Sequence, residues 1–285
     1  MNEELPILDN HMHLRGNGKG IKAAKEFSKA GGTHIVLVNL PSWTYGVNLT
    51  DPSNYKKPFD KCIAMSKEID KKTDLNTYPV IGVHPAELTK WTEEGKSLEE
   101  TFELMKKGLN LASEYIKEKK AIALGEIGRP HYPVSKEVME LSHELIRHSF
   151  RLANDNGFSV QLHTESMTKE DVIKLSKMIN ESGLDKSKVI KHFSNPIIDV
   201  YTQEGILPSI ISKKENLKEA IKKGSRFLME TDYLDDPQRP GAVLGPKNVP
   251  KKTNWLLNQK IVNKEDLINI HKTIPEEAYG IKVNL

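Results

Sequence analysis

Histidine and carboxylate residues recur at the points where apolar segments of this 285-residue chain end. The segment DNHMH places His11 and His13 two residues apart, and in an extended strand such residues point to the same side. They could therefore bind one metal ion together. A His-x-His pair is weak evidence on its own, so the interpretation depends on the other strand ends.

Four further ionisable residues also lie where apolar segments end. They are Glu126 in AIALGEIG, His163 in FSVQLHTE, His192 in KVIKHFS and Asp232 in FLMETDY. A buried imidazole or carboxylate without a partner costs free energy, so such groups are normally hydrogen-bonded or bound to metal. Mixed nitrogen and oxygen ligands suit divalent ions. The six residues together predict a hydrolytic site with two metal ions. The alternative is a set of hydrogen-bonded polar residues in the core.

The segments that carry these residues have the composition of buried parallel strands. They are rich in Val, Ile and Leu and do not alternate with polar residues, which is typical of strands covered on both faces. Eight strands are expected: Leu5–Asp9, His34–Leu40, Tyr78–Val83, Ala121–Glu126, Phe158–His163, Val189–Phe193, Ile206–Ile211 and Phe227–Thr231.

Helical patterns lie between the expected strands. One begins at Ser97, which forms a capping-box pair with Glu100, and its apolar residues recur at three- and four-residue steps. Others are expected over 135–156, from about Thr168, and over 21–30. The alternation predicts a parallel α/β fold. A single, distorted (β/α)8 barrel of the TIM type over residues 1–285 fits this length best, with the metal site at the carboxyl ends of the strands. A doubly wound open sheet is the alternative.

Two long segments without a regular pattern follow expected strands, Pro41–Pro58 and Tyr233–Pro250. In a barrel both would lie over the carboxyl ends of the strands, where long loops commonly wall a substrate pocket. The segment Gly16–Gly20, GNGKG, resembles a phosphate loop but lacks the Gly-Lys-Ser/Thr ending. It is interpreted as a flexible turn.

Composition excludes several classes of protein. The net charge is +3, hydrophobic residues make up 37%, and the mean hydropathy is −0.52. No apolar run approaches the roughly 18–20 residues that span a bilayer, and a single cysteine excludes an intramolecular disulfide framework. The acidic start does not read as a secretory signal. We expect a cytoplasmic protein without a membrane partner. Near-neutral charge does not indicate a dedicated nucleic-acid binder, so nucleic acid is considered as a substrate only. The oligomeric state is not indicated.

Six motifs in this order resemble those of the TatD family of metal-dependent hydrolases, which belongs to the amidohydrolase superfamily of barrel enzymes. They are DNHMHL, GVHPAE, GEIG, QLHTE, KHFSNP and METDY, and the closing EEAYGI is similar to the family's last helix. The resemblance extends from Asp9 to about Tyr279. Many relatives in the superfamily bridge two metals with a carbamylated lysine, whereas the matching strand end here offers Glu126, which favours the TatD branch.

The resemblance implies a ligand set and a mechanism. The first metal would be bound by His11, His13 and Asp232, the second by His163 and His192, and Glu126 would bridge the two. The ions would be Mg, Mn or Zn. Cations about 3.5–4 Å apart hold a bridging water and lower its pKa, so that a hydroxide can attack phosphorus or a carbonyl carbon. Asp232 could act as the general base, and with Glu126 it is the expected catalytic pair.

Three residues beside these ligands are candidates for substrate binding. His84 could donate a hydrogen bond to a phosphoryl oxygen, or it could be a structural histidine before Pro85. Arg129 and His131 lie in GRPHYP, where the TatD pattern usually has an apolar and an acidic residue. Arg129 could bind a phosphate or carboxylate through two parallel hydrogen bonds.

The departure at Arg129–His131 leaves the substrate open. A phosphodiesterase or deoxyribonuclease of TatD type is expected first. The alternatives are an amidohydrolase acting on a C–N or C–O bond of a small molecule, and a metal-stabilised binding protein without turnover. A basic, open groove would indicate nucleic acid, and a closed aromatic pocket would indicate a small molecule.

Overall fold

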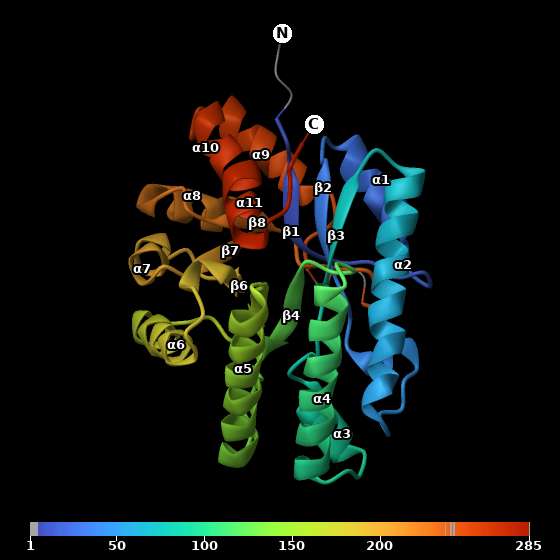
Figure 1. The fold of residues 1–285 in the computed structure, drawn as a ribbon. Helices are drawn as coiled ribbons and strands as arrows, with labels where there is room; N and C mark the ends of the chain where they lie inside the picture. Colours follow the sequence, from blue (N-terminus) through green and yellow to red (C-terminus); the bar gives the residue numbers. More distant parts are fainter. Residues whose placement is uncertain (1–4, 237, 240, 242, 285) are drawn as a thin grey trace.

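Parallel strands form the centre of the molecule and helices surround them (Figure 1). The computed structural model describes residues 5–236, 238–239, 241 and 243–284. The strands are β1 Leu8–His13, β2 His34–Val38, β3 Asn76–Ile81, β4 Ala123–Gly128, β5 Ser159–His163, β6 Val189–Ser194, β7 Leu207–Ile211, β8 Leu228–Glu230 and β9 Tyr233–Leu234.

The helices follow the strands in regular alternation. The α-helices are α1 Ile21–Lys29, α2 Lys56–Lys72, α3 Glu87–Glu93, α4 Leu98–Lys117, α5 Lys136–Asn156, α6 Lys169–Ser182, α7 Ile198–Glu204, α8 Lys214–Lys223, α9 Asn248–Asn258, α10 Lys264–Ile268 and α11 Ile274–Tyr279. Short helical segments are η1 Ser42–Tyr45, η2 Pro52–Tyr55, η3 Lys186–Lys188 and η4 Asn269–Thr273. None of the helices in the described ranges is long and apolar enough to cross a membrane.

The curled sheet closes on itself through an interrupted last strand. From β1 to β8, each strand pairs in parallel with the next one along the chain, and β9 pairs in parallel with β1. Only Thr231 and Asp232 separate β8 from β9. These two short strands therefore act as one broken eighth strand that joins β7 to β1. The expected distorted (β/α)8 barrel is confirmed, and the alternative of an open, doubly wound sheet is not observed.

The expected strand positions hold, but several ends differ. The first strand runs over Leu8–His13 and not over Leu5–Asp9, so His11 and His13 lie inside it. The helix between the sixth and seventh strands is short, as expected, and covers Ile198–Glu204. At the start of α4, the Ser97 side chain accepts a hydrogen bond from the backbone of Glu100, which is one half of the expected capping box.

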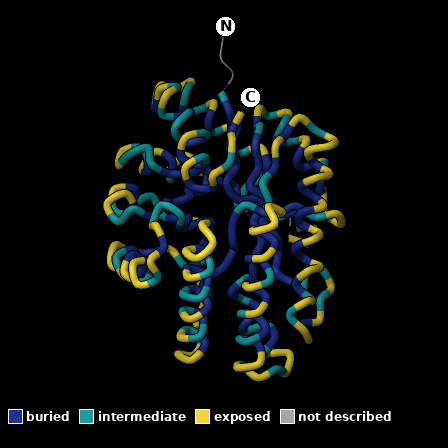
Figure 2. Tube along the Cα trace, viewed as in Figure 1, coloured by how far each residue is buried: buried dark blue, intermediate teal, exposed yellow. Residues whose placement is uncertain are grey.

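The amino end of the barrel is filled by apolar side chains and closed by the last helix. Strand residues including Leu8, Val36, Val80 and Leu228 form one buried cluster, and Ala278 of α11 packs against them. The described chain begins and ends, at Leu5 and Asn284, at this end of the barrel (Figure 1). Burial is concentrated in the strands, while exposed residues lie on the outer faces of the helices (Figure 2). The carboxyl ends of the strands thus remain available for a site.

Candidate metal centre

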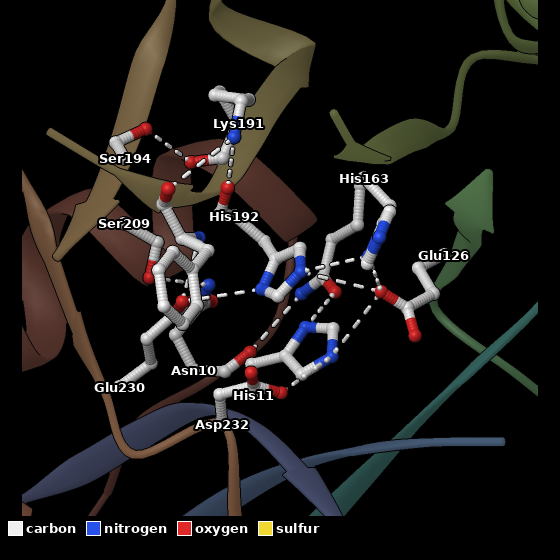
Figure 3. Close-up of polar contacts among 12 residues, drawn as sticks. Asn10, His11, Glu126, His163, Lys191, His192, Ser194, Ser209, Glu230 and Asp232 are labelled. Atoms are coloured by element: carbon white, nitrogen blue, oxygen red, sulfur yellow. Dashed lines mark hydrogen bonds and ion pairs between the residues drawn. The ribbon is translucent and has the colours of Figure 1, made fainter. Parts of the chain in front are cut away.

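All six predicted ligands meet at the carboxyl ends of the strands, and Figure 3 shows five of them. They come from β1 (His11 and His13), β4 (Glu126), β5 (His163), β6 (His192) and the break between β8 and β9 (Asp232). Strand pairing is irregular where three of the ligands lie: over Asp9–Met12, Leu124–Ile127 and Lys191–Ser194. Bulges of this kind re-aim side chains next to active sites.

Glu126 lies between two groups of histidines. Its Oε2 atom is 2.7 Å from His163 Nδ1 and 3.3 Å from His192 Nε2. Its Oε1 atom is 3.6 Å from His13 Nε2. Asp232 completes the group around β1, because its Oδ1 atom is 3.7 Å from His13 Nε2 and 3.9 Å from His11 Nε2. A carboxylate between two sets of ligands is the arrangement expected of a bridge.

Hydrogen bonds leave one nitrogen of each of three histidines facing the centre. His11 Nδ1 donates to Gln161 Oε1 (2.9 Å), and His13 Nδ1 donates to the Val38 carbonyl oxygen (3.0 Å). His192 Nδ1 donates to Glu230 Oε1 (3.2 Å). In the neutral form of each ring, the form that binds metal, this bond places the proton on Nδ1 and the lone pair on Nε2. Metal-binding histidines are oriented in this way by an outer partner.

His163 faces the centre with the other nitrogen. Its Nδ1 atom lies beside Glu126, and its Nε2 atom is 3.0 Å from His131 Nδ1. With a metal ion bound at Nδ1, the ring proton would lie on Nε2, from which it could form a hydrogen bond to His131 Nδ1. His131, predicted for substrate binding, is therefore in contact with a predicted metal ligand.

His84 reaches the cluster but has the opposite tautomer. The backbone N–H of Ala86 donates to His84 Nδ1 (3.1 Å), which places the ring proton on Nε2, 3.6 Å from Glu126 Oε1. Burial lowers the pKa of His84 to about 3, so the ring is neutral. Its Nε2–H is thus available as a hydrogen-bond donor toward the centre. The role in substrate binding stays a prediction.

The electrostatics of the cluster favour a bound cation. Burial alone would raise the pKa of Glu126, but the imidazoles of His163 and His84 hold it well below its usual range. Burial also opposes a charge on His192, yet the carboxylates of Glu230 and Glu126 raise its pKa to about 10. Burial raises the pKa of Asp232 to about 8, although the nearby His192 lowers it. The ionised carboxylate of Glu126 therefore favours positive charge at the centre.

The donor set fits divalent metal ions. Among the described residues, three groups have ligand atoms within 4.8 Å of one another: His11, His13 and Asp232; His84, Glu126 and His163; and His11, His192 and Glu230. The first group matches the expected ligands of one metal. Imidazole nitrogens and carboxylate oxygens in such a mixture suit Zn, Mn and related ions.

Sequence reasoning missed the residues that orient the ligands. Glu230 is fully buried, and its Oε1 atom accepts from both His192 and the Phe193 backbone N–H (2.7 Å). Its Oε2 atom has no partner among the described residues. The signal was present in METDY, because a carboxylate in an apolar strand needs a partner.

Asp9, a second residue that the sequence analysis missed, joins β1 to the segment between β8 and β9. Asp9 accepts hydrogen bonds from Thr231 Oγ1 (2.7 Å), from the Thr231 backbone N–H (3.1 Å) and from the His11 backbone N–H (3.2 Å). It thereby ties β1 to the broken strand immediately before Asp232. Because it fixes both metal-binding segments to each other, Asp9 supports the first group of ligands.

Arg129 is engaged in the protein itself. Its guanidinium forms two hydrogen bonds with the Glu165 carboxylate and a third with His143 Nε2 (2.9 Å). The guanidinium N–H groups that could bind a phosphate are thus paired with Glu165. Direct contact of Arg129 with a substrate stays a prediction.

A cavity of about 620 Å³ opens beside the metal centre. His163, His192 and Asp232 line one side. The rest of the lining is part apolar and part polar. The apolar side chains are Phe193, Ile211, Val243 and Leu244, and the polar ones are His131, Thr164, Glu165, Ser166 and Lys213. The expectation that Tyr233–Pro250 walls a pocket is met by Gly241, Val243 and Leu244. In the other long segment, the Trp43 ring lies 6.4 Å from the His84 ring.

The glycine-rich segment after β1 is occupied by a side chain of the protein. Asp235 Oδ1 accepts from the Lys19 N–H (2.8 Å), and Asp235 Oδ2 accepts from the Gly20 N–H (2.7 Å). The donors that resemble a phosphate loop therefore hold the segment that follows Asp232. This agrees with the interpretation as a turn, although the turn is tied down by a carboxylate.

Comparison with known proteins places this geometry in context. A family model described as TatD related DNase matches residues 8–280. An uncharacterized protein, MJ1127, of Methanocaldococcus jannaschii is 38% identical over 286 residues, which cover 99% of each chain. A TatD family hydrolase from Entamoeba histolytica has a similar structure, with a TM-score of 0.64, 16% identity and coverage of 96% of this chain and 99% of that one. The phosphotriesterase homology protein from Escherichia coli, complexed with phosphate in its active site, matches with a TM-score of 0.59, 10% identity and coverage of 97% and 99%.

Proposed function

The chain belongs to the TatD-related DNase family of metal-dependent hydrolases, and we propose that it is a phosphodiesterase that uses two divalent metal ions. The observation that carries the proposal is the position of Glu126 between the two histidine groups. Its Oε1 atom is 3.6 Å from His13, and its Oε2 atom is 2.7 Å from His163, 3.3 Å from His192 and 3.8 Å from His11. The phosphate in the active site of the Escherichia coli phosphotriesterase homology protein supports phosphorus as the reacting centre.

The two proposed ions would be held by separate sets of residues. His11, His13 and Asp232 would hold one, His163 and His192 would hold the other, and Glu126 would contact both. When bound, divalent ions supply Lewis acidity and lower the pKa of a coordinated water toward neutrality. The orienting bonds from His11 to Gln161 and from His192 to Glu230 fix the rings before binding.

Asp232 would accept a proton from the attacking water, in the ionised form that a bound cation favours. It lines the cavity and its side chain is 18% exposed, whereas the side chain of Glu126 is 5% exposed. A general base must reach the water that enters with the substrate, and Asp232 is the more accessible carboxylate of this pair. His84, with its proton on Nε2, is placed to donate a hydrogen bond to an oxygen of the attacked group.

A small-molecule substrate is the second candidate, and the lining of the cavity favours it. Among the described residues that line the 620 Å³ cavity, Lys213 is the only lysine or arginine, four others are apolar, and Glu165 adds a carboxylate. A track for a long polyanion needs several cations along the backbone. A nucleotide, a short phosphodiester or a small ester or amide therefore fits this cavity better than the middle of a long polymer.

The test is hydrolysis of bis(p-nitrophenyl) phosphate and of a single-stranded DNA oligonucleotide, with Mg²⁺, Mn²⁺ and Zn²⁺ supplied in turn. We expect metal-dependent turnover that is lost in the His11→Ala/His13→Ala variant. Asp232→Asn should reduce kcat by orders of magnitude, because proton transfer and metal placement both suffer.

His148→Ala is the matched control, since His148 lies on α5 and pairs with Asn110, outside the metal centre. It should keep wild-type turnover. Absence of phosphodiester turnover from a protein that retains metal, together with hydrolysis of a lactone or amide substrate, would overturn the phosphodiesterase in favour of the small-molecule hydrolase.

A further inference from the structure

A buried lysine lies behind the metal centre. Lys191 of β6 is 0% exposed, and a lysine is almost never fully buried unless its charge has partners. In a regular strand its side chain points away from that of the neighbouring His192, and Lys191 does not line the cavity. Its charge has no part in the proposed reaction, so its burial calls for another explanation.

Backbone carbonyl oxygens hold the Lys191 ammonium. The Nζ atom donates to the carbonyl oxygen of His192 at 2.5 Å (Figure 3). It also donates to the carbonyl oxygens of Thr164 (3.3 Å) and Phe193 (3.4 Å). An ammonium group has three N–H donors, so these bonds use all of them. The buried charge is therefore satisfied by the chain itself.

The carbonyl groups around the ammonium belong to the two segments that carry the second proposed set of ligands. Thr164 follows His163 at the end of β5, and His192 is itself a predicted ligand on β6. The pairing of β5 with β6 ends at Leu162 and Lys191. The ammonium thus continues the link between the two strands beyond their last paired residues, where the ligands lie.

A buried anion holds the following residue from its other end. The Phe193 N–H donates to Glu230 Oε1 (2.7 Å), while the Phe193 carbonyl oxygen accepts from Lys191. Phe193 has a φ of +49°, in the left-handed region that bulky residues rarely adopt, and such a conformation persists only where the surroundings impose it. Glu230 Oε1 also accepts from His192 Nδ1. Two buried groups of opposite charge therefore set the course of the chain at His192.

We propose that Lys191 is a positioning residue of the metal centre, whose ammonium holds the chain at His163 and His192 so that both imidazoles face Glu126. The inference rests on the proposed two-metal site, because its effect is expected at the ion that His163 and His192 would hold. The contacts of Lys191 are with backbone oxygens, so it acts through the chain and not on a metal ion or a substrate.

The first test is the binding of Co²⁺ to Lys191→Met. Methionine keeps much of the apolar stem of lysine and removes the N–H donors. Affinity is measured by competition with a chelator, and the visible absorption of bound Co²⁺ reports the geometry of its ligands. We expect one of the two ions to bind about 10- to 100-fold more weakly and with a changed spectrum, because His163 and His192 are no longer held. The ion at His11 and His13 should bind as in the wild type.

The second test restores the ammonium without restoring the residue. Lys191→Ala removes the side chain beyond Cβ, and added n-propylammonium supplies an equivalent group. We expect n-propylammonium to recover the metal affinity and the Co²⁺ spectrum of Lys191→Ala and to leave the wild type unchanged. Tetramethylammonium carries the charge without an N–H donor, and n-propanol is neutral. Neither should recover the affinity or the spectrum.

Lys188→Met is the matched control. Lys188 also donates to backbone carbonyl oxygens, those of Glu277 (3.1 Å) and Ala278 (3.2 Å), but at the amino end of the barrel. This variant should keep the wild-type affinity and spectrum. Circular dichroism and melting of each metal-free protein are recorded first, so that metal binding is compared only between folded proteins.

The outcomes separate the role of Lys191 from the function on which it rests. Wild-type affinity and spectrum in folded Lys191→Met, no recovery by n-propylammonium in Lys191→Ala, or equal recovery by tetramethylammonium would overturn the positioning role. Failure of both Lys191 variants to fold would also overturn it, because Lys191 would then serve the fold alone.

Two further results would support Lys191 and count against the proposed function. Binding of a single Co²⁺ that Lys191→Met weakens would keep the positioning role and contradict the two-metal centre. Binding of two ions that depends on Lys191, without turnover of any phosphodiester, would keep the positioning role and contradict the phosphodiesterase.

Discussion

Glu230 forms a hydrogen bond with the nitrogen of His192 that faces away from the metal centre. Its Oε1 atom accepts from His192 Nδ1 at 3.2 Å, and the carboxylate is fully buried. This pair orients the His192 ring and makes its Nε2 atom a better metal ligand. Glu230→Gln keeps the shape of the side chain and removes its charge. We expect metal affinity at the centre to fall about 10- to 100-fold, measured by competition with a chelator.

Glu181→Gln, an exposed change on α6, is the control for this variant and should keep wild-type affinity. If Glu230→Gln held metal as tightly as the wild type, Glu230 would have only a packing role. His192 would then have to be oriented by its contacts with Glu126 and His163.

The ligands could be predicted because strand ends in a parallel barrel converge. His163 and His192 each stand at the end of a run of apolar residues, and the barrel brings such ends together irrespective of their distance in sequence. The same logic found Asp232 but not Glu230. Glu230 and Asp232 are two residues apart, so in a regular strand their side chains would point to the same side. Asp232 adopts a φ of +51°, which interrupts the strand and changes the direction of its side chain.

The partners of the ligands could not be predicted, since no local pattern encodes them. Gln161 bonds to His11 across 150 residues, and Tyr279 of α11 bonds to Gln161 across 118. The pairing of Arg129 with Glu165 is a further contact of this kind, which its position in GRPHYP does not indicate. Such pairs depend on which side chains face one another after folding, and periodicity describes only which face of its own element a residue occupies.

His131 distinguishes this chain from the usual TatD pattern, and we expect it to position His163. His163 Nε2 lies 3.0 Å from His131 Nδ1. His131→Leu removes the acceptor, so one of the two proposed metals should bind about tenfold more weakly. His131→Asn restores an acceptor and should recover part of the affinity. A chelator titration followed by metal analysis checks both variants, and unchanged affinity in His131→Leu would contradict the positioning role.

Asp235 should stabilise the wall of the cavity. It is buried, and it accepts hydrogen bonds from the backbone N–H groups of Lys19 and Gly20. Asp235→Ala leaves these donors without an acceptor, which costs about 1–3 kcal/mol. We expect a lower Tm and faster proteolysis within residues 233–247. Asp199→Ala, an exposed change on α7, should leave both unchanged. An equal Tm for Asp235→Ala and wild type would show that water replaces the carboxylate.

The buried His271 predicts a loss of stability in acid. Its Nδ1 atom accepts from the Leu8 N–H (3.2 Å), its Nε2 atom lies 2.8 Å from Thr253 Oγ1, and burial lowers its pKa from 6.5 to about 4. Between these values the unfolded chain binds one more proton than the folded one, so the free energy of unfolding falls as pH decreases. The contribution of neutral His271 to the free energy of unfolding is fully present above pH 6.5 and is lost by about pH 4.

The slope expected from His271 is about 1.4 kcal/mol per pH unit within that window. His271→Asn retains a polar side chain but has no titratable group, so its stability should fall less steeply than that of the wild type. Urea unfolding at pH 7, 6, 5 and 4.5 measures both proteins. Histidines of the metal centre also titrate, but they do so in both proteins, so the difference between the two curves isolates His271. Parallel curves would mean that acid sensitivity arises elsewhere, with the metal centre as the first place to look.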